Sequence, residues 1–496
     1  MKRNREVRRL NWRKRTCAVL VLFAATAMAL PAQTFTTLHS FDGTDGYFPQ
    51  VALVQGIDGN LYGTVTNGGA NSGGTVFKIT PSGTFTTIYS FCSQSGCLDG
   101  STPFAGLVQA TNGDFYGTTG EGGANGGANC APDGGCGTVF KITPTGTLTT
   151  LHGFCAQSGC TDGRLPVGTL VKATNGDFYG TTNQGGADDN CSDSLSCGTV
   201  FKITPNGTLT TLHSFDGTDG EWPYSGLVQA TNGDFYGTTY YAGANGSGTV
   251  FKVTPSGTLA TLHSFDGTDG AEPLDAGLVQ ATSGDLYGTT WRGGANNGGT
   301  VFKITPSGTF TTIYNFCSQS GCTDGEYPVA GLVQGTNGHL YGTTSSGGAN
   351  GGGTVFRITP SGTLTTLYNV CSQGGNRCTD GYRPQAGLAQ ATNGDFYGTT
   401  FDGGANGYGT IFNLSLGLGP FVETRPTSGK LGAAVQILGT DLTGATTVTF
   451  NGTAAVFTVI SRTLITTTVP TGATTGAVQV ATLGGTLSSN VSFRVP

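Results

Sequence analysis

Residues 226–265 read GLVQATNGDFYGTTYYAGANGSGTVFKVTPSGTLATLHSF and decide the fold of the chain. Four segments of this stretch are rich in Val, Phe, Tyr and Thr, as β-strands are. These segments are residues 226–230, 235–239, 248–254 and 258–265. Asn-Gly at 232–233 joins the first two segments and Pro-Ser-Gly at 255–257 joins the last two, and both are turn sequences. The stretch therefore predicts four antiparallel strands in chain order.

This stretch occurs in seven copies. Each copy contains Phe or Leu followed by Tyr-Gly-Thr, and the glycines of successive copies are 51 to 63 residues apart. The tyrosines of the seven copies are Tyr62, Tyr116, Tyr179, Tyr236, Tyr287, Tyr341 and Tyr397. Four strands within about 55 residues match one blade of a β-propeller. Only 10% of the residues are charged, and no helical spacing of apolar residues occurs beyond residue 32. We therefore expect an all-β chain that contains a seven-bladed β-propeller.

The two ends of the repeat region complement each other. The seventh copy finishes with GTIFNLSLG at 409–417, a third strand that no fourth strand follows. The fourth-strand phrase TFTTLHSF stands alone at 34–41, before the first copy. A propeller ring is commonly closed by an N-terminal strand that completes the last blade. The sequence therefore predicts that residues 34–41 form the outer strand of the seventh blade.

The repeat is absent from residue 418 onward. Short apolar segments there alternate with turns about every ten residues, as in a small β-sandwich. The phrases RPTSGKLGAAVQILGTDL (425–442), VTFNGTAA (448–455) and VPTGATTGAVQVAT (469–482) resemble those of immunoglobulin-like IPT/TIG domains. That resemblance implies a spacer or adhesion module. The repeat region at 34–416 resembles the bacterial extracellular tandem repeats of GloVer type, which implies an extracellular location and no particular activity.

The first 32 residues have the composition of a secretory signal peptide. Eight Lys and Arg residues precede an apolar run at 17–30, and small residues close the segment. The run is shorter than the roughly 20 residues that span a bilayer, so we expect no membrane span after cleavage. Removing the leader leaves 15 basic against 28 acidic residues, a net charge of −13, which disfavours a nucleic-acid partner. We expect a signal peptide at 1–32, a propeller at 33–417, an immunoglobulin-like domain at 418–496, and a secreted or cell-surface location.

The 12 cysteines beyond the leader fall into six close pairs within polar loops, and each repeat copy keeps or lacks both members of a pair. The pairs are Cys92/Cys97, Cys130/Cys136, Cys155/Cys160, Cys191/Cys197, Cys317/Cys322 and Cys371/Cys378. Joint presence or absence favours disulfide bonds formed in an oxidising compartment. The spacing within the pairs and the lack of His in these loops do not match a zinc site, so we assign no metal ligands.

One aspartate before a glycine recurs in every copy. The set is Asp45, Asp99, Asp162, Asp219, Asp269, Asp324 and Asp380. Such an aspartate is expected to accept backbone N–H groups in a turn. The alternative is a calcium site built from Asp42 and Asp45 with carbonyl oxygens, and calcium is the one cofactor that the sequence leaves open. Four histidines, His39, His152, His213 and His263, share a strand position with Tyr in other copies, so we expect them to be packing residues.

Differences between copies are concentrated in two loop sets, one between the second and third strands and one between blades. Their aromatic and charged residues include Trp222, Tyr224, Tyr240, Tyr241, Trp291, Arg292, Tyr327, Tyr382, Phe401 and Asp402. Aromatic side chains on braced loops suit an extracellular glycan or protein ligand, although unconstrained loop drift would also produce variation. We therefore predict a non-catalytic recognition or structural module with no catalytic residue. The alternative is a secreted polysaccharide lyase or hydrolase, for which the loose acid candidates are Glu121, Asp188, Asp189 and Asp402.

Overall fold

The computed structural model describes residues 33–496 apart from 126–129, 131–134, 188–190, 192–195, 276 and 375–377. The predicted signal peptide lies outside the described residues. Within them, helix is limited to four short turns, η1 (Ser95–Cys97), η2 (Ser158–Cys160), η3 (Ser320–Cys322) and η4 (Leu442–Gly444). No helix in this described part has the length and hydropathy needed to cross a membrane. The predicted all-β class is confirmed.

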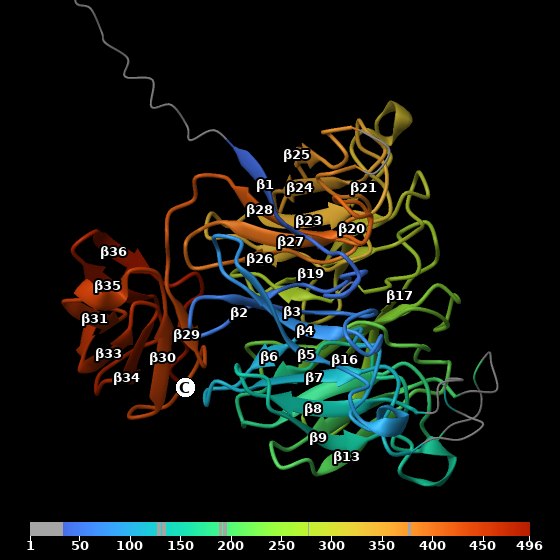
Figure 1. Ribbon diagram of the computed structural model, residues 1–496, viewed down its shortest axis with the longest axis horizontal. Coiled ribbons are helices and arrows are strands. Elements are labelled where there is room, and N and C mark those ends of the chain that lie inside the picture. Colours follow the sequence, from blue (N-terminus) through green and yellow to red (C-terminus); the bar gives the residue numbers. More distant parts are fainter. Residues whose placement is uncertain are drawn as a thin grey trace, which may run out of the picture.

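Seven four-stranded antiparallel sheets form the seven blades, which follow one another around the propeller (Figure 1). The first strands of blades 1 to 7 are β2 (Val54–Gln55), β6 (Val108–Gln109), β10 (Val171–Lys172), β14 (Val228–Gln229), β18 (Val279–Gln280), β22 (Val333–Gln334) and β26 (Ala389–Gln390). The second strands are β3 (Leu61–Val65), β7 (Phe115–Thr119), β11 (Phe178–Thr182), β15 (Phe235–Thr239), β19 (Leu286–Thr290), β23 (Leu340–Thr344) and β27 (Phe396–Thr400).

The third strands are β4 (Thr75–Ile79), β8 (Thr138–Ile142), β12 (Thr199–Ile203), β16 (Thr249–Val253), β20 (Thr300–Ile304), β24 (Thr354–Ile358) and β28 (Thr410–Ser415). The fourth strands of blades 1 to 6 are β5 (Phe85–Ser90), β9 (Leu148–Gly153), β13 (Leu209–Ser214), β17 (Leu259–Ser264), β21 (Phe310–Asn315) and β25 (Leu364–Asn369). The fourth strand of blade 7 is β1 (Thr34–Ser40), which pairs antiparallel with β28 from Thr34 opposite Ser415 to Ser40 opposite Thr410. The predicted closure by the N-terminal strand is confirmed.

The first strand of each blade is shorter than the sequence predicts. Residues 226–230 were expected to form the first strand of blade 4, but only Val228 and Gln229 pair with the second strand. Ala230 already belongs to the turn, because its N–H donates to the carbonyl of Asp234 at 2.9 Å. Gly226, just before this strand, runs so close to the inner segment of the preceding blade that an added Cβ would lie 2.4 Å from the carbonyl oxygen of Thr169. Crowding near the propeller axis therefore ends the strand pairing early.

A glutamine on the first strand joins neighbouring blades. Its Oε1 accepts the N–H of a turn residue in the preceding blade at 2.9 to 3.0 Å at six of the seven junctions. The bond from Thr392 N–H to Gln55 Oε1 joins blade 7 to blade 1 and so completes the ring. Lys172 occupies the glutamine position in blade 3 and cannot accept such a bond. Burial lowers the pKa of this lysine.

The core lies between adjacent blades. The constant tyrosine of one blade packs on the second strand of the next, as Tyr179 does on Phe235 with ring centroids 4.0 Å apart. Phe215 and Phe251 pack in the same buried cluster, and Phe251 is fully buried. Because each cluster contains residues of two blades, a single blade cannot bury its apolar faces alone. The residues common to all copies therefore build the scaffold, as the sequence comparison predicts.

Residues 423–488 form two further sheets. One contains β29 (Glu423–Arg425), β30 (Ala434–Leu438), β34 (Leu464–Thr468) and β33 (Phe457–Ser461). The other contains β32 (Thr453–Ala455), β31 (Thr447–Phe450), β35 (Val478–Thr482) and β36 (Gly485–Ser488). Their facing residues enclose a buried core that includes Val435, Ile437, Phe450, Val480 and Phe493. This is the predicted immunoglobulin-like β-sandwich.

The propeller has two faces that differ in their connections. The turns between strands 1 and 2 and between strands 3 and 4 open on one face, here the turn face. The loops between strands 2 and 3 and between blades open on the other, here the loop face. The C-terminal domain lies against the turn face, where Arg425 donates to Gln55 and Gln109 and Thr463 donates to the carbonyl of Ile57 (Figure 1). The loop face is therefore not covered by this domain.

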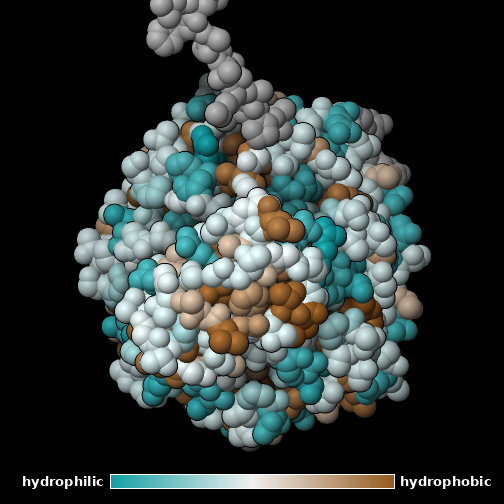
Figure 2. Space-filling view, turned by 90° about the vertical axis from the view of Figure 1, so that its left-hand side faces the viewer, coloured by the Kyte–Doolittle hydropathy of each residue, from teal (hydrophilic) through white to brown (hydrophobic). Residues whose placement is uncertain are grey.

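The outer face of the C-terminal domain carries exposed apolar side chains. Figure 2 looks onto this side of the molecule and shows hydrophobic side chains gathered near its middle. The exposed large hydrophobic residues of the domain are Leu431, Val456, Ile460 and Leu483. They point away from the sandwich core, so they contribute little to its packing.

Deletion of residues 34–41 tests the ring closure. We expect this deletion to lower the urea midpoint and to make the unfolding of the whole propeller less cooperative, because blade 7 loses β1 and an open edge remains. The ring stacking of Phe35 on Tyr368 of blade 6, at 3.8 Å between centroids, is also lost. Circular dichroism and tryptophan fluorescence during urea titration measure the effect.

A synthetic peptide of residues 33–42 added in trans should restore part of the lost stability, and a scrambled peptide should not. An unchanged urea midpoint after the deletion would show that β1 is dispensable.

Candidate ligand-binding face

In every blade, a residue of the loop that enters from the preceding blade (the incoming loop) pairs with a residue that follows strand 2. The residue after the constant Asp-Gly forms an isolated antiparallel bridge with the second residue after strand 2. These bridges are Tyr47–Asn67, Ser101–Glu121, Arg164–Gln184, Glu221–Tyr241, Ala271–Arg292, Glu326–Ser346 and Tyr382–Asp402. In blades 2 to 7, a second pair lies beside this bridge. The carbonyl of the following residue of the incoming loop accepts the N–H of the first residue after strand 2, at 2.9 to 3.1 Å. We call these four residues per blade the variable ladder.

The ladder backbone is constant, whereas its side chains differ from blade to blade. At three of the four positions the seven blades carry seven different residue types. The residues on either side, Asp-Gly and Pro in one loop and Gly-Thr in strand 2, are the same in all seven blades. The bridges and hydrogen bonds are formed by backbone atoms, so they hold whatever side chain is present. Each blade therefore has four variable positions on a fixed backbone frame, some of them buried, as Arg164 and Glu221 are, and others accessible, as Tyr241 and Tyr382 are.

The second ladder residue of every blade has a left-handed backbone. Its φ lies between 52° and 64° although none of the seven is glycine. These residues are Phe48, Thr102, Leu165, Trp222, Glu272, Tyr327 and Arg383. The N–H of each donates to a carbonyl of the preceding blade at 2.8 to 3.2 Å. Since left-handed backbone costs an L-residue about 1–2 kcal/mol, side chains are retained here at the expense of stability.

The constant aspartate braces the incoming loop. In each of the seven blades, its carboxylate accepts at least one backbone N–H of that loop, as Asp45 does from Asp42 at 2.9 Å. The His or Tyr on the preceding outer strand also donates to it, as in His39 to Asp45 at 2.7 Å and Tyr89 to Asp99 at 2.8 Å. The predicted turn role is confirmed. The interchange of His and Tyr follows from this shared hydrogen bond, which the sequence alone did not reveal.

Each incoming loop is stabilised by one of two devices. Disulfides close the loops that carry Cys92–Cys97, Cys155–Cys160, Cys317–Cys322 and Cys371–Cys378. The other two predicted pairs, Cys130–Cys136 and Cys191–Cys197, are also bonded and lie between strands 2 and 3. The three incoming loops without cysteine contain a second aspartate instead, and Asp216 accepts both the N–H and the hydroxyl of Thr218 at 2.9 and 2.7 Å. All six predicted pairings are confirmed.

The same aspartates bear on the calcium alternative. Asp42 Oδ1 accepts the N–H and hydroxyl of Thr44 and the N–H of Asp45. Asp45 uses one oxygen for Asp42 N–H and the other for His39. A calcium ion needs 6 to 8 oxygen ligands and would compete with these protein donors. The arrangement favours the turn interpretation, and calcium binding stays an open prediction.

Blades 4 to 6 bring most of the predicted aromatic residues together. Trp222 and Tyr241 are nearly parallel, with ring centroids 5.9 Å apart, and Tyr240 lies 6.4 Å from each. Tyr224, just outside the ladder, packs edge-on against Tyr240 at 5.5 Å. The indole N–H of Trp222 is buried and has no hydrogen-bond acceptor among the described residues. We call Trp222, Tyr240, Tyr241, Trp291 and Tyr327 the aromatic cluster.

Glu272 connects the blade 4 and blade 5 parts of this cluster. Tyr240 Oη donates to Glu272 Oε2 at 3.2 Å, and burial together with the nearby Glu272 raises the pKa of Tyr240 to about 12. Arg292 Nε lies 3.8 Å from the same carboxylate, and its guanidinium lies 4.1 Å from the ring centroid of Trp291. Trp291 in turn contacts Tyr327 of blade 6 at 6.2 Å. Glu272 was not among the residues predicted from the sequence, although the variation of its position among the copies could have identified it.

The remaining predicted residues lie on blade 7. Arg383 pairs with Asp402 at 3.4 Å and lies 5.4 Å from the ring of Phe401. Burial raises the pKa of Asp402, and the Arg383 charge opposes this effect. Phe401 stacks on Phe48 of blade 1 with centroids 4.4 Å apart. Tyr382 is exposed beside them. The ten predicted residues thus form two groups, one on blades 4 to 6 and one on blade 7. Among the described residues, no ring contact or ion pair joins the two groups.

The acid candidates for the enzyme alternative are dispersed. Glu121 belongs to the ladder of blade 2, where its carboxylate accepts the hydroxyl of Thr102 at 3.1 Å. Asp402 belongs to blade 7 and is paired with Arg383. Asp188 and Asp189 lie outside the described residues. Among the described candidates, no acid and base converge on one point.

Asp275 is a buried acid that was not among the residues predicted from the sequence. Blade 5 has three residues between its constant proline and the following glycine, where blade 4 has two, so Asp275 is part of a one-residue insertion. It forms an isolated bridge with Ala330 of blade 6, and burial raises its pKa to about 7. The extra residue in the repeat alignment is the signal that could have revealed it.

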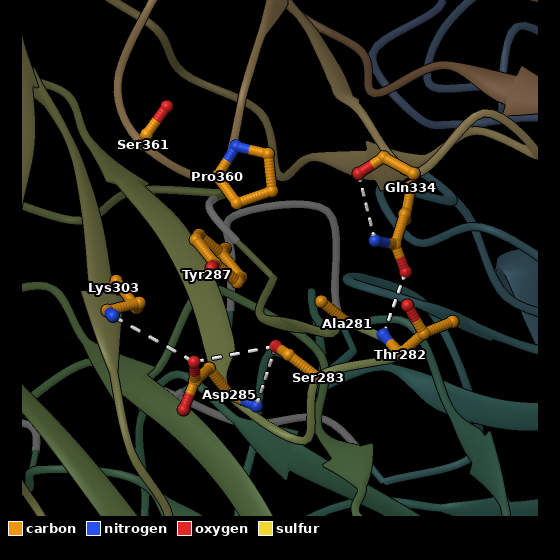
Figure 3. Close-up of a pocket in the computed structure, with 10 residues that line it drawn as sticks. Ala281, Thr282, Ser283, Asp285, Tyr287, Lys303, Gln334, Pro360 and Ser361 are labelled. Carbon is orange, nitrogen blue, oxygen red and sulfur yellow. Dashed lines mark hydrogen bonds and ion pairs between the residues drawn. The ribbon is translucent and has the colours of Figure 1, made fainter.

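A cavity of about 520 Å³ lies on the turn face between blades 5 and 6 (Figure 3). It is lined mainly by scaffold residues, with Thr282 N–H donating to Gln334 Oε1 and Lys303 paired with Asp285 at 3.9 Å. Ser283 lines it where blades 3, 4, 6 and 7 have an asparagine that donates to the constant tyrosine hydroxyl, as Asn232 does to Tyr236. The smaller serine side chain leaves this space open, and the predicted ligand residues are all elsewhere.

Comparisons with known proteins agree with this architecture. The Gloeobacter/Verrucomicrobia repeat matches residues 21–192, 129–334 and 318–454, and the IPT/TIG domain matches residues 422–495. No curated protein matches the chain. Similar solved structures include a fungal alcohol oxidase in complex with copper, at 14% identity and TM-score 0.50, covering 93% of this chain and 98% of that chain.

Two bacterial structures are also similar. A Bacteroides uniformis protein classed as a 6-phosphogluconolactonase has 17% identity and TM-score 0.43, covering 68% of this chain and 88% of its own. The extracellular domain of a B. thetaiotaomicron protein classed as a hybrid two-component system has 11% identity and TM-score 0.48, covering 92% of this chain and 58% of its own. At these identities the likeness concerns the fold alone.

The fold and the repeats define a seven-bladed β-propeller protein with an appended immunoglobulin-like domain. The family match extends over more than half of the sequence. The chain belongs to the Gloeobacter/Verrucomicrobia repeat family, and its C-terminal part is an IPT/TIG domain.

Substitutions at Leu165 test the left-handed ladder position. We expect Leu165→Gly to be about 1 kcal/mol more stable than Leu165→Ala, because glycine adopts positive φ without steric cost. Thr210, an exposed residue of β13, supplies the control, since there alanine should be more stable than glycine. Urea denaturation of the four variants measures both differences. The same order at both positions would contradict a left-handed backbone at 165.

The hydrogen bonds of Asp216 should make the stability of the protein depend on pH. The Thr218 hydroxyl bond is the main cause that lowers the pKa of this carboxyl in the folded state. A depressed folded pKa contributes stability above the unfolded pKa near 4 and loses it as pH falls through the folded value. The difference in unfolding free energy between the natural protein and Asp216→Ala should therefore be constant from pH 5 to 7 and shrink below about pH 4. Urea denaturation at pH 3 and pH 6 measures this difference. Thr218→Val, which removes the hydroxyl bond, should make the stability of the protein depend less on pH. An equal difference at pH 3 and pH 6 would contradict a stabilising role for the ionised Asp216.

Proposed function

We propose that this chain is an exported, non-catalytic recognition module that binds an extracellular glycan or protein through its loop face. The variable ladder is the observation that carries the proposal. A site built for recognition needs side chains that can change while their placement does not, and the ladder provides this in every blade. Stability alone would favour glycine at the seven left-handed positions, yet none carries it.

The chemistry of blades 4 to 7 supports a binding role. Large aromatic side chains occur in the ladders of all four blades, and Tyr241 and Tyr382 are exposed. Aromatic rings contribute a large contact area and lose little conformational entropy on binding. The buried indole N–H of Trp222 lacks an acceptor among the described residues, and a small rearrangement on binding would allow a ligand to supply one.

The position of the C-terminal domain also supports it. Contacts such as Thr463 with Ile57 and Gln436 with Thr111 hold the domain against the turn face. A neighbour attached through this domain would leave the loop face free. Export is supported by the composition of residues 1–32 and by the six disulfides, which persist in oxidising compartments.

Glycan-array and protein-array binding of the double variant Trp222→Ala/Trp291→Ala tests the proposal. We expect the natural protein to bind at least one ligand and the double variant to lose at least tenfold in affinity, because both indole rings of the aromatic cluster are removed. Thr210→Ala, at an exposed position of β13 outside the ladder, is the control and should bind as the natural protein does.

Thermal unfolding must show that both variants remain folded. Equal binding by the double variant would place the ligand elsewhere. Turnover of a polysaccharide by the purified protein would contradict the non-catalytic assignment.

A further inference from the structure

Blades 5 and 7 carry the same three chemical groups in their ladders. In blade 5 these are the indole of Trp291, the guanidinium of Arg292 and the carboxylate of Glu272. In blade 7 they are the ring of Phe401, the guanidinium of Arg383 and the carboxylate of Asp402. In both blades the guanidinium lies against the ring and pairs with the carboxylate. We call each set a ring–charge triad.

The two triads place their charges on opposite sides of the ladder. Trp291 and Phe401 occupy the same position, the first residue after strand 2. The left-handed position holds the carboxylate Glu272 in blade 5 and the guanidinium Arg383 in blade 7, and the last ladder position is reversed accordingly. No other ladder contains both a cation and a carboxylate. The two blades thus reach the same combination of ring, guanidinium and carboxylate with the charges at exchanged positions. This agreement favours a common binding role over independent drift of the two loops.

Each triad balances its own charge. The side chain of Arg292 is 47% exposed and that of Arg383 is 43% exposed, whereas the side chains of Glu272 and Asp402 are 23% and 25% exposed. An exposed guanidinium edge donates hydrogen bonds, and a paired carboxylate accepts them. The aromatic rings supply apolar faces, with exposed Tyr241 near the first triad and Tyr382 within the ladder of the second.

These groups match the surface of a neutral sugar. A pyranose ring has an apolar C–H face that can stack on an aromatic ring and hydroxyl groups at its edge that both donate and accept. A polyanion would instead meet carboxylates beside each arginine and a chain with 29 acidic against 23 basic residues. We propose that the two triads are equivalent subsites for one neutral polysaccharide, an inference that rests on the proposed binding role of the loop face.

Binding of purified protein to soluble polysaccharides tests the ligand class. The probes are neutral mixed-linkage β-glucan, galactomannan and xyloglucan, with polygalacturonate and alginate as polyanions. We expect binding to at least one neutral polymer that changes less than twofold between 20 and 500 mM NaCl, because no net charge is neutralised. Affinity electrophoresis and titration calorimetry provide the measurement.

Variants in both triads test their equivalence. Trp291→Ala and Phe401→Ala should each weaken binding of the neutral polymer at least tenfold. One polymer chain that occupies both subsites binds the second at high effective concentration, and losing either subsite removes this gain. Glu272→Arg alone should weaken it about tenfold, and the exchanged pair Glu272→Arg/Arg292→Glu should return to within about threefold of the natural protein. The exchange reproduces in blade 5 the arrangement that blade 7 already has.

The outcomes separate this inference from the proposed function. Binding confined to polyuronates or to a protein, and lost in the Trp222→Ala/Trp291→Ala variant, would overturn the ligand class and leave the recognition role intact. An exchanged pair as weak as Glu272→Arg, or a Phe401→Ala variant that binds normally, would overturn the equivalence of the triads. Binding that no loop-face variant alters would overturn the proposed function itself.

Discussion

One backbone hydrogen bond recurs at every blade junction and links the stability of the ring to its candidate site. The N–H of the left-handed ladder residue donates to a carbonyl of the preceding blade, from Phe48 to Tyr408 at 3.2 Å through to Arg383 to Gly352 at 3.0 Å. The same residue presents its side chain on the loop face. Because the bond uses only backbone atoms, the ring closes with any residue that has a backbone N–H at this position. A chain with this arrangement can vary its surface without rebuilding its fold.

The division of labour between the two faces follows from the strand order. Turn-face residues are nearly identical between blades because their side chains connect neighbouring blades, as Gln55 does with Thr392, and support the C-terminal domain through Arg425. On the loop face the constant Asp, Gly and Pro hold the backbone, and side-chain contacts between blades, such as Phe48 with Phe401 and Tyr240 with Glu272, differ from junction to junction. Differences between blades are therefore concentrated on the loop face and few on the turn face, where Lys172 and Ser283 are two examples. The ladder is where a blade acquires its own chemistry.

Much of this architecture could be predicted from the sequence because the repeats provide seven comparisons within one chain. The sequence assigned the orphan phrase at 34–41 to a ring-closing strand, the paired cysteines to disulfides and the constant Asp to a turn role, and the structure confirms these three assignments. The pairing of Glu272 with Arg292 could not be predicted, since it depends on a left-handed backbone that no sequence pattern marks. The two-residue length of the inner strands also depends on crowding at the axis, a three-dimensional effect.

Hydrogen exchange of the ladder amides measures whether the bonds between blades hold the left-handed residues in place. In the free protein, the N–H groups of the seven left-handed residues should exchange slowly in all blades, because each donates to the preceding blade. With a bound ligand, further protection should appear in the loop-face peptides of blades 4 to 7 and not in the turn-face peptides. Fast exchange of these amides in the free protein, or ligand protection confined to the turn face, would contradict the account.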